Sequence, residues 1–503
     1  MRRSTGRVRM TTMVVTCAAV TVTLALPAQV AAAPSPTRLA ERLVDKVSAQ
    51  GANRHLIAFQ RIADRNDGNR AAGTPGYDAS VDYVVGRLQA AGYDVSTPEF
   101  SFDQLVAGDL TVGDTNIAAQ KILLSANTPE GGVTAPLAVV PEDADTGCQA
   151  EDYAGLDVTG DIAVIRRGGC TFEIKAATAA TAGAVVAVIS DNVPPAPFRP
   201  VIENAATVPA GFVSQEDGDI LAGLDGQSAT VDLRSEMTVS RNVIAQTRSG
   251  RPDNVVMLGA HLDSVPEGPG INDNGSGSAA LLEIALKLGP DRKGVNNAVR
   301  FAWWGAEELG LLGSEAYVAS LDFEQQLDIA MYLNFDMIGS PNAGYFVYDG
   351  DDSAGTGAGP GPFGSAQIEE TFNSYLRDQA GVEPLPTDFD GRSDYGPFIA
   401  AGIPAGGLFT GAEDIKTPEE AALWGGTAGI AFDPCYHAVC DTLGNLDRTA
   451  LGRNLDAAAW TTGVYAYSTD TVNGVPPRDV RAQARVNTLL AAAAPAGDAQ
   501  DAA

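Results

Sequence analysis

Four apolar runs in the second half of the chain constrain its fold more than any other feature. Stretches typical of helices separate them, and the runs are NVVMLGA (254–260), AVRFAWWG (298–305), IAMYLNFD (329–336) and IPAGGLF (403–409). Strands that are apolar on both faces occur in parallel sheets that helices cover on each side. The sequence therefore predicts an α/β fold with a mostly parallel central sheet between about 240 and 475.

Chemically active side chains stand at or soon after the ends of these runs. They are His261, Asp273, Glu307, Glu308 and Asp336, with His437 in a later loop. In sheets of this kind, ligands bind outside the carboxyl ends of the strands. Taken singly, each residue has an ordinary explanation as part of a polar turn or a solvated helix start. The set is harder to explain in that way, because two of the only three histidines in the chain belong to it.

Two histidines and three carboxylates form a suitable set of ligands for two zinc ions. Zinc accepts imidazole nitrogen and carboxylate oxygen, and a catalytic zinc keeps one position for water. Two such ions stand about 3.5–4 Å apart and can activate one hydroxide between them. We expect His261 to bind zinc and Asp273, in a glycine-rich loop, to bridge both ions. Asp263 is placed to accept the other imidazole N–H and fix its tautomer.

The N-terminal segment predicts export. Residues 1–33 contain four arginines, an apolar run over about 10–26 and small residues before Ala33, which is typical of a signal peptide. A membrane anchor fits less well, because the run is short and Pro27 ends it. Lipidation of Cys17 also fits less well, since most of the apolar run follows that cysteine. We expect a secreted, extracellular protein.

The remaining four cysteines agree with an oxidising compartment. An even number of cysteines in an exported chain predicts disulfides. Local pairing, Cys148 with Cys170 and Cys435 with Cys440, is the simplest of three connectivities. A zinc site built from all four thiolates is the alternative, but the chain contains no C-x-x-C pair.

The charge balance narrows the choice of partners. The chain has 63 acidic and 33 basic residues and a net charge of −30. Such a surface repels phosphates, so we expect no nucleic-acid partner and no binding to anionic membranes. We also expect a monomer.

The middle of the chain differs from its flanks in the pattern of strands and helices that its sequence predicts. Short strands such as APLAVV, DIAVIRR and AVVAVIS surround one helix, and this part contains no histidine. We interpret it as an inserted α/β module with a structural or substrate-guiding role. The predicted organisation is a signal peptide at 1–33, a catalytic part at 38–127 and 236–475, the insert at 128–235, and a low-complexity, disordered tail at 476–503.

Several ordered motifs resemble one known family. The segments GAHLDSV, GINDNGSGSA, WWGAEELGLLGS, LNFDMIGSPNAGYFVYDG, DGRSDYGPF and CYHAVCDT resemble the secreted bacterial leucyl-type aminopeptidases, which use two zinc ions together. The resemblance covers about 240–470 and the helical start at 50–100. GDIAVIRRGGCTFEIKAATAATAGAVVAV resembles a protease-associated domain. The resemblance implies a zinc exopeptidase-like fold and hydrolysis of the N-terminal peptide bond of peptides and proteins.

The resemblance also implies the ligand sets. Asp273 would be shared, with His261 and Asp336 completing one zinc site and Glu308 and His437 the other. It further implies a cis peptide bond after Asp273. Calcium is not predicted: some relatives bind calcium near the C-terminal helix through acidic residues, and here Asp456 is accompanied by Gly452 where a second acid would be expected.

Catalytic and substrate-binding roles follow from the same resemblance. Glu307 would take a proton from the metal-bridging water and pass it to the leaving amine. Tyr436 would donate a hydrogen bond to the oxyanion. Arg392 would position the substrate terminus and its carbonyl, although a surface ion pair is the alternative for that residue. An apolar side-chain pocket for large apolar N-terminal residues would be lined by Met337, Gly391 and Phe409.

Two other kinds of protein remain as alternatives. One is an enzyme of the same fold with another activity. A carboxypeptidase would need a cluster of cations for the substrate carboxylate, and a single-zinc acyl-transfer enzyme would have a smaller ligand set. The other is a non-catalytic binding protein, which would lack a ligand or the base. The complete set of ligands favours the aminopeptidase.

Overall fold

The computed structural model describes residues 36–193, 208–469 and 478–492, together with the single residues 1, 6, 200 and 202. Most of the predicted signal peptide at 1–33 lies outside the described residues. Within the described part of the chain, no helix combines the length and the apolar composition that crossing a membrane requires.

The first sheet carries the predicted parallel core. Its eight strands follow the order β1-β10-β12-β11-β13-β16-β14-β15. Their bounds are β1 (Val95–Ser96), β10 (Val243–Gln246), β12 (Asn297–Trp304), β11 (Arg251–His261), β13 (Ile329–Phe335), β16 (Ala405–Phe409), β14 (Phe346–Tyr348) and β15 (Leu385–Thr387). Strand β11 is parallel to β12 and β13, and β13 is parallel to β16. This confirms the predicted fold class.

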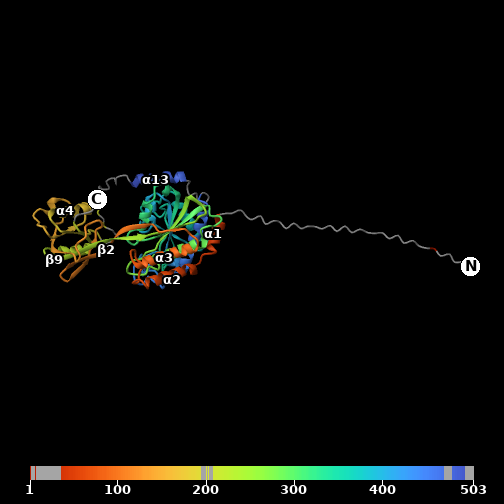
Figure 1. Cartoon of the computed structure of the whole chain (residues 1–503), viewed down its shortest axis with the longest axis horizontal. Helices are drawn as coiled ribbons and strands as arrows, with labels where there is room; N and C mark the ends of the chain where they lie inside the picture. Colours follow the sequence, from red (N-terminus) through yellow and green to blue (C-terminus); the bar gives the residue numbers. More distant parts are fainter. Residues whose placement is uncertain are drawn as a thin grey trace. The chain divides into compact units, whose positions relative to one another are not determined.

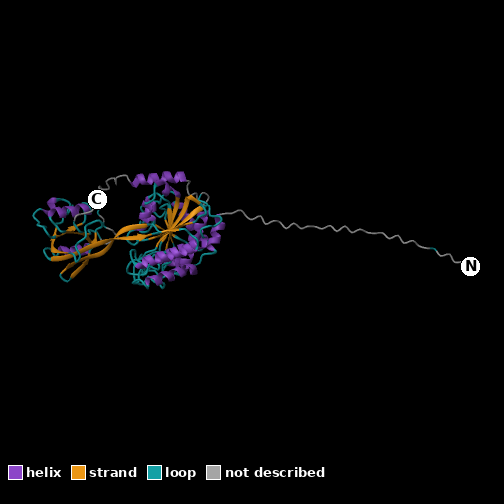
Figure 2. Ribbon diagram, viewed as in Figure 1, coloured by secondary structure: helices purple, strands orange, loops and turns teal. Residues whose placement is uncertain are grey.

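Alternate residues of β11 face opposite sides of the sheet. Val256 and Leu258 pack into one core cluster, whereas Val255 and Met257 pack into another. Helices therefore cover both faces (Figure 2). The helices of the first cluster are α1 (Pro36–Val44), α2 (Ala49–Ala63), α3 (Pro75–Ala90), α6 (Gly275–Leu288), α9 (Ser365–Asp378) and α12 (Arg448–Tyr467), and those of the second are α7 (Leu312–Ala319) and α10 (Tyr395–Ala400).

The second sheet starts earlier in the chain than the predicted insert. Its order is β3-β2-β9-β5-β6-β7-β8-β4. Its strands are β2 (Glu99–Val112), β3 (Thr115–Ala118), β4 (Gln120–Lys121), β5 (Val133–Val139), β6 (Ile162–Arg166), β7 (Val186–Ser190), β8 (Ala210–Val213) and β9 (Ser228–Arg241). Strands β2 and β9 pair from end to end, and both are labelled in Figure 1. Residues 99–121, which we assigned to the catalytic part from sequence, therefore contribute three strands to this second sheet.

The insert is organised around helices and one disulfide. Helix α4 (Phe172–Ala182) covers the face of β6 and β7 that carries Ala163, Ile165 and Ile189, and α5 (Gln215–Ala222) packs on the opposite face. Cys148 and Cys170 form a disulfide. The second predicted disulfide, between Cys435 and Cys440, is also present. Both local pairings are thus confirmed.

The tail predicted to be disordered from 476 contains a helix, α13 (Arg478–Ala492). Two of its arginines, one turn apart, are buried and hold it in place. Arg485 donates to the carbonyls of Gly402, Gln326 and Ile329, and Arg481 donates to Ile329 and Asn254. The prediction of disorder was wrong for α13, because an alanine-rich composition does not reveal the specific contacts of these two arginines.

Candidate active site

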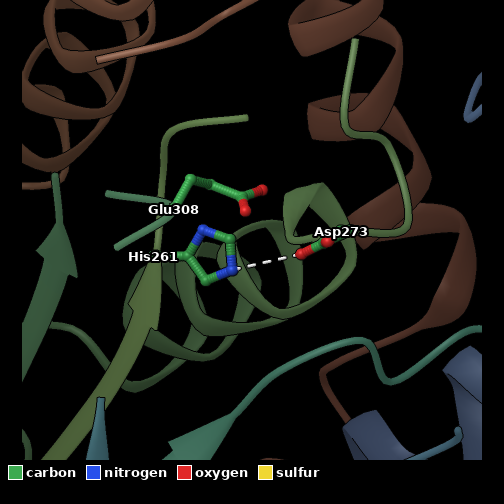
Figure 3. Close-up of side chains that lie close together, drawn as sticks. All are labelled: His261, Asp273 and Glu308. Atoms are coloured by element: carbon green, nitrogen blue, oxygen red, sulfur yellow. Dashed lines mark ion pairs between the residues drawn. The ribbon is translucent and has the colours of Figure 1, made fainter. Parts of the chain in front are cut away.

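Six side chains from distant parts of the sequence meet beyond the carboxyl ends of β11, β12 and β13. His261 ends β11, Asp336 directly follows β13, and Glu307 and Glu308 follow β12. Asp273 directly precedes Asn274, the N-cap residue of α6, and His437 lies in the loop before α12. Figure 3 shows His261, Asp273 and Glu308 lying close together. The parallel strands thus place these residues at one edge of the sheet, as the sequence pattern led us to expect.

Asp273 stands between the two histidines. Its Oδ1 lies 3.2 Å from Nε2 of His261, and its Oδ2 lies 3.2 Å from Nε2 of His437. Nε2 of His261 also lies 3.3 Å from Oδ1 of Asp336, and Nε2 of His437 lies 3.0 Å from Oε2 of Glu308. The five side chains therefore form two adjacent clusters that share one carboxylate.

These separations suit tetrahedral zinc. Two ligand atoms each about 2.1 Å from a tetrahedral ion lie about 3.4 Å apart. The observed spacings of 3.0–3.3 Å are close to that value. Oε1 of Glu308 and Oδ1 of Asp336 are buried and have no hydrogen-bond partner among the described residues. Such oxygens are costly unless a cation lies beside them. The donor set therefore fits a pair of zinc ions.

Burial and contacts with the two histidines shift the pKa values of the site residues in opposite directions. Burial raises the pKa of Glu307 well above its ordinary value, and burial raises that of Glu308 to about 8. For Asp273, burial acts in the same direction, but hydrogen bonds from both histidines outweigh it and lower the pKa. Burial lowers the pKa of His437, yet the contacts with Asp273 and Glu308 prevail and raise it to about 10. Buried carboxylates in such a cluster are ionised at low cost only when cations accompany them.

The loop around Asp273 is shaped by its neighbour Asn274. The Asn274 side chain accepts from the Gly277 N–H, which caps α6, and donates to the carbonyl oxygen of Phe335. A Cβ on Gly277 would lie 2.1 Å from that same carbonyl oxygen, so only glycine fits there. The Asp273–Asn274 peptide bond is cis, as the resemblance implied.

Three residues beside the site have left-handed backbone conformations, although none is glycine. They are Ala306, Met337 and His437, with φ angles of 56°, 47° and 53°. Such conformations are uncommon for residues with a Cβ and persist where the surrounding structure imposes them. They turn the chain sharply beside Glu307 and Asp336 and aim both carboxylates into the site.

Asp263 connects two parts of the site. Nδ1 of His261 lies 3.2 Å from its carbonyl oxygen and 3.6 Å from its carboxylate Oδ1. The carboxylate accepts the backbone N–H groups of Glu307 and Glu308 at 3.2 and 3.3 Å. The side chain therefore fixes the Glu307–Glu308 turn as well as facing the imidazole that it was predicted to orient.

Replacing Asp263 with Asn should lower zinc affinity by about 10–100-fold, the usual cost of losing an orienting partner. The amide retains only one acceptor oxygen for two backbone N–H groups and presents an N–H₂ group to the imidazole. Competition with a fluorescent chelator would measure the change, with Asp109→Asn, an exposed residue of β2, as the control. An affinity equal to that of the unmodified protein would show that Asp263 does not support the site.

A buried polar network that we did not predict holds the bridging loop from behind. The Asp441 carboxylate accepts the N–H groups of Asn272 and Asp273 at 2.9 and 3.0 Å. Asn445 donates to both Asp441 and Asp433. The only sequence signal was that Asp441 directly follows the second cysteine of CYHAVC.

Arg70 is a second unpredicted support. Its side chain is fully buried and donates to the carbonyl oxygens of Leu262, Pro269 and Gly270. It therefore clamps the segment that links His261 to Asp273. Burial lowers the pKa of Arg70 to about 10, and the Asp263 and Asp441 carboxylates act in the opposite direction, so its positive charge offsets part of the negative charge nearby.

A hydrogen-bonded chain of side chains supports Asp336. Trp304 donates to Tyr332, which donates to Asn334, which donates to Ser393. Ser393 in turn donates to Oδ2 of Asp336 at 2.6 Å, which leaves Oδ1 facing His261. This chain orients one carboxylate from the interior of the sheet.

A cavity opens directly onto the six side chains. Arg392, Tyr436, Met337 and Phe409 line it, as expected from sequence, but Gly391 is not among its lining residues. The Gly391 N–H donates to the Tyr395 hydroxyl instead. The lining residues that we did not anticipate are Tyr348, Thr387, Asp388, Asp390, Ser393, Tyr395, Ala412, Glu413 and Asp414.

Arg392 lies at this cavity with two partners. Its Nη2 donates to the Tyr436 hydroxyl at 3.2 Å and lies 2.9 Å from Oε1 of Glu413.

Asp456, the residue considered for calcium binding, lies on α12, where burial raises its pKa to about 6. Among the described residues, no group of potential metal ligands includes Asp456.

Comparison with known proteins gives matches over both parts of the chain. The model of peptidase family M28 matches residues 242–462, and the PA domain model matches residues 133–221. A probable lipoprotein aminopeptidase, LpqL, of Mycobacterium tuberculosis is 49% identical over 452 residues, which cover 88% of this chain and 90% of that protein. A probable leucine aminopeptidase 2 of Aspergillus fumigatus is 44% identical over 82% of this chain and 81% of its own.

Solved structures agree with these matches. A zinc aminopeptidase from Bacillus subtilis is 28% identical, with a TM-score of 0.59 over 83% of this chain and 94% of its own.

Proposed function

Because this chain belongs to peptidase family M28 and is a zinc metallo-aminopeptidase, we propose that it is secreted, binds two zinc ions, and removes large apolar residues from peptide N-termini with Glu307 as general base. The observation that most supports the two-zinc centre is that the two oxygens of Asp273 each face a different histidine at 3.2 Å.

The proposed ligand sets follow the two clusters. His261, Asp273 and Asp336 would hold one ion, and His437, Asp273 and Glu308 the other. When bound, the zinc ions would supply the Lewis acidity that makes a water molecule nucleophilic and polarises the scissile carbonyl.

Glu307 is suited to proton transfer rather than to zinc binding. Its carboxylate lines the cavity, and its Oε2 lies 3.9 Å from Nε2 of His261, farther than the oxygens of the proposed ligands. It accepts a proton from the attacking water as the water oxygen bonds to the carbonyl carbon. It then delivers that proton to the amine nitrogen as the C–N bond breaks, which releases a free amino acid and a shortened peptide.

Tyr436 would stabilise the oxyanion. Arg392 donates an N–H to the Tyr436 oxygen, so the phenol hydrogen remains available to donate to the substrate. A comparable oxyanion donor contributes about 2.7–4 kcal/mol to transition-state stability. Glu307 and Asp336 would face the free α-amine of the substrate, which favours unblocked N-termini. Met337 and Phe409 supply apolar surface for the first side chain.

The purified protein should hydrolyse leucyl-p-nitroanilide, lose this activity on chelation with 1,10-phenanthroline, and recover it when zinc is added, because the activity depends on the zinc ligands. N-acetyl-leucyl-p-nitroanilide, which has a blocked amine, is the matched control and should not be cleaved. Cleavage of both substrates at equal rates would contradict an aminopeptidase mechanism.

The proposal of secretion rests on the character of residues 1–33 and on the two disulfides. The Mycobacterium tuberculosis relative is named a lipoprotein. Fractionation of producing cells distinguishes a secreted protein from a lipid-anchored one. We expect soluble activity in the culture medium. Activity that is confined to membranes and released by Cys17→Ala would indicate a lipid anchor instead.

A further inference from the structure

The cavity at the proposed zinc centre carries more negative charge than zinc binding requires. Besides the ligands and Glu307, four carboxylates line it: Asp388, Asp390, Glu413 and Asp414. We call these four the acidic rim. Among the described lining residues, Arg392 is the one arginine or lysine. Two zinc ions would balance Asp273, Glu307, Glu308 and Asp336, so the acidic rim and Arg392 together leave a net charge of −3.

Within the described ranges, three of the four rim carboxylates have no cationic side-chain partner. Arg392 pairs with Glu413 at 2.9 Å. Asp388 accepts from the Thr356 hydroxyl, and Asp390 accepts from the Tyr395 hydroxyl and the Arg392 backbone N–H. No hydrogen bond or ion pair of the Asp414 side chain occurs among the described residues. Asp388, Asp390 and Asp414 are therefore available to a cation from the substrate.

Apolar and acidic surfaces line the same cavity. Met337, Tyr348 and Phe409 line it together with the acidic rim, and Asp388 is only half exposed. Lysine and arginine have a long apolar stem and a charged end, and they bind well where apolar walls adjoin an acidic or wet region. Leucine uses the apolar walls alone.

Resting on the proposed aminopeptidase function, we propose that the acidic rim makes this enzyme an aminopeptidase for N-terminal lysine and arginine as well as for apolar residues. Asp388, Asp390 and Asp414 are the specificity-determining residues. The apolar stem of the substrate packs on Met337, Tyr348 and Phe409, and its cationic end approaches the rim. Substrates with an acidic first residue are disfavoured by the same charge.

The experiment compares lysyl- with norleucyl-p-nitroanilide, which share a four-carbon stem and differ in the terminal ammonium group. The ratio of their kcat/KM values is the readout, and it does not depend on the fraction of active enzyme. In the triple variant Asp388→Asn, Asp390→Asn and Asp414→Asn, the ratio should fall about three- to tenfold, as expected for partly exposed charges. The change should lie in KM, because the contact is present before and during the reaction.

Two further measurements complete the test. Added salt should lower the ratio for the unmodified enzyme, since the screening length falls from about 10 Å at 0.1 M to about 3 Å at 1 M, and it should hardly alter the ratio for the triple variant. Asp109→Asn, which does not line the cavity, should leave the ratio unchanged. Each Asp→Asn change is also made singly, so that one variant that fails to fold does not end the test.

The possible outcomes distinguish a failure of the proposed aminopeptidase function from a failure of the role proposed for the acidic rim. If neither the unmodified enzyme nor a single variant cleaves any aminoacyl p-nitroanilide, the proposed function itself is wrong. If norleucyl-p-nitroanilide is cleaved and the lysyl ratio stays the same in the variants and in salt, the function stands and the acidic rim does not select cations.

Discussion

Replacing Glu307 with Gln should lower kcat for leucyl-p-nitroanilide by about 10²–10⁴-fold, the range attributed to a positioned acid–base group. The amide has nearly the same shape as the carboxylate but cannot accept the proton of the attacking water. Because the Glu307 side chain is not among the proposed zinc ligands, the zinc content of the variant should match that of the unmodified protein. Steady-state kinetics and metal analysis of the same preparation provide both numbers.

The matched control for this variant is Glu130→Gln, an exposed glutamate outside the cavity, which should keep its full kcat. A Glu307→Gln enzyme with normal kcat and normal zinc content would exclude Glu307 as the base. Loss of zinc together with kcat would instead assign Glu307 to the ligands.

Asp273→Asn should have the second large effect, because one carboxylate faces both halves of the site. An amide offers one oxygen to one zinc ion and an N–H₂ group to the other, which repels the second ion. Activity should then fall by about a thousandfold or more, corresponding to the loss of several kcal/mol of stabilisation by metal ions. The zinc content should drop to one ion or fewer per chain.

Asp109→Asn is again the control for the same chemical change outside the site, and it should retain full activity and zinc. Circular dichroism would verify that Asp273→Asn remains folded. A folded Asp273→Asn protein that keeps two zinc ions per chain would show that Asp273 does not bridge them.

The position of the site could be predicted from sequence because it depends on strand ends. Residues 255–260 and 329–333 are apolar throughout, and such runs become central parallel strands. Once those strands lie side by side, His261 and Asp336 must lie at the same edge of the sheet. Their mutual distance of 3.3 Å follows from that topology rather than from any local preference.

The supports behind the site could not be predicted in this way. Arg70 and Asp441 act through contacts with residues more than 150 positions away in the chain. Nothing in the sequence distinguishes a buried arginine from an exposed one. Hydrophobic periodicity indicates which face of a helix or strand is buried, but it does not identify the partners of a loop residue. Only the folded chain shows that the Arg70 side chain satisfies three carbonyl oxygens of one loop.

The pairing of residues 99–112 with the second sheet could not be predicted for a related reason. Residues 99–102 and 109–112 alternate between buried and exposed positions, as a strand with one covered face does. That pattern indicates a strand but not the sheet to which it belongs. Its partner, β9, lies more than 100 residues later in the chain, so the pairing became visible only in the structure.

The role proposed for the acidic rim could not be predicted from the sequence either. Asp388, Asp390 and Asp414 stand in loops rich in polar residues, where acids are ordinary. Their importance arises from sharing one cavity with the site residues, which no spacing in the sequence reveals.

The most direct test of the two-zinc centre is a crystal structure of the active protein with anomalous data collected at the zinc edge. Two zinc peaks are expected about 3.5–4 Å apart, with the Asp273 carboxylate between them. His261 and Asp336 should contact one ion, and His437 and Glu308 the other. A single peak, or two peaks that do not share Asp273, in a crystal of fully active enzyme would contradict it.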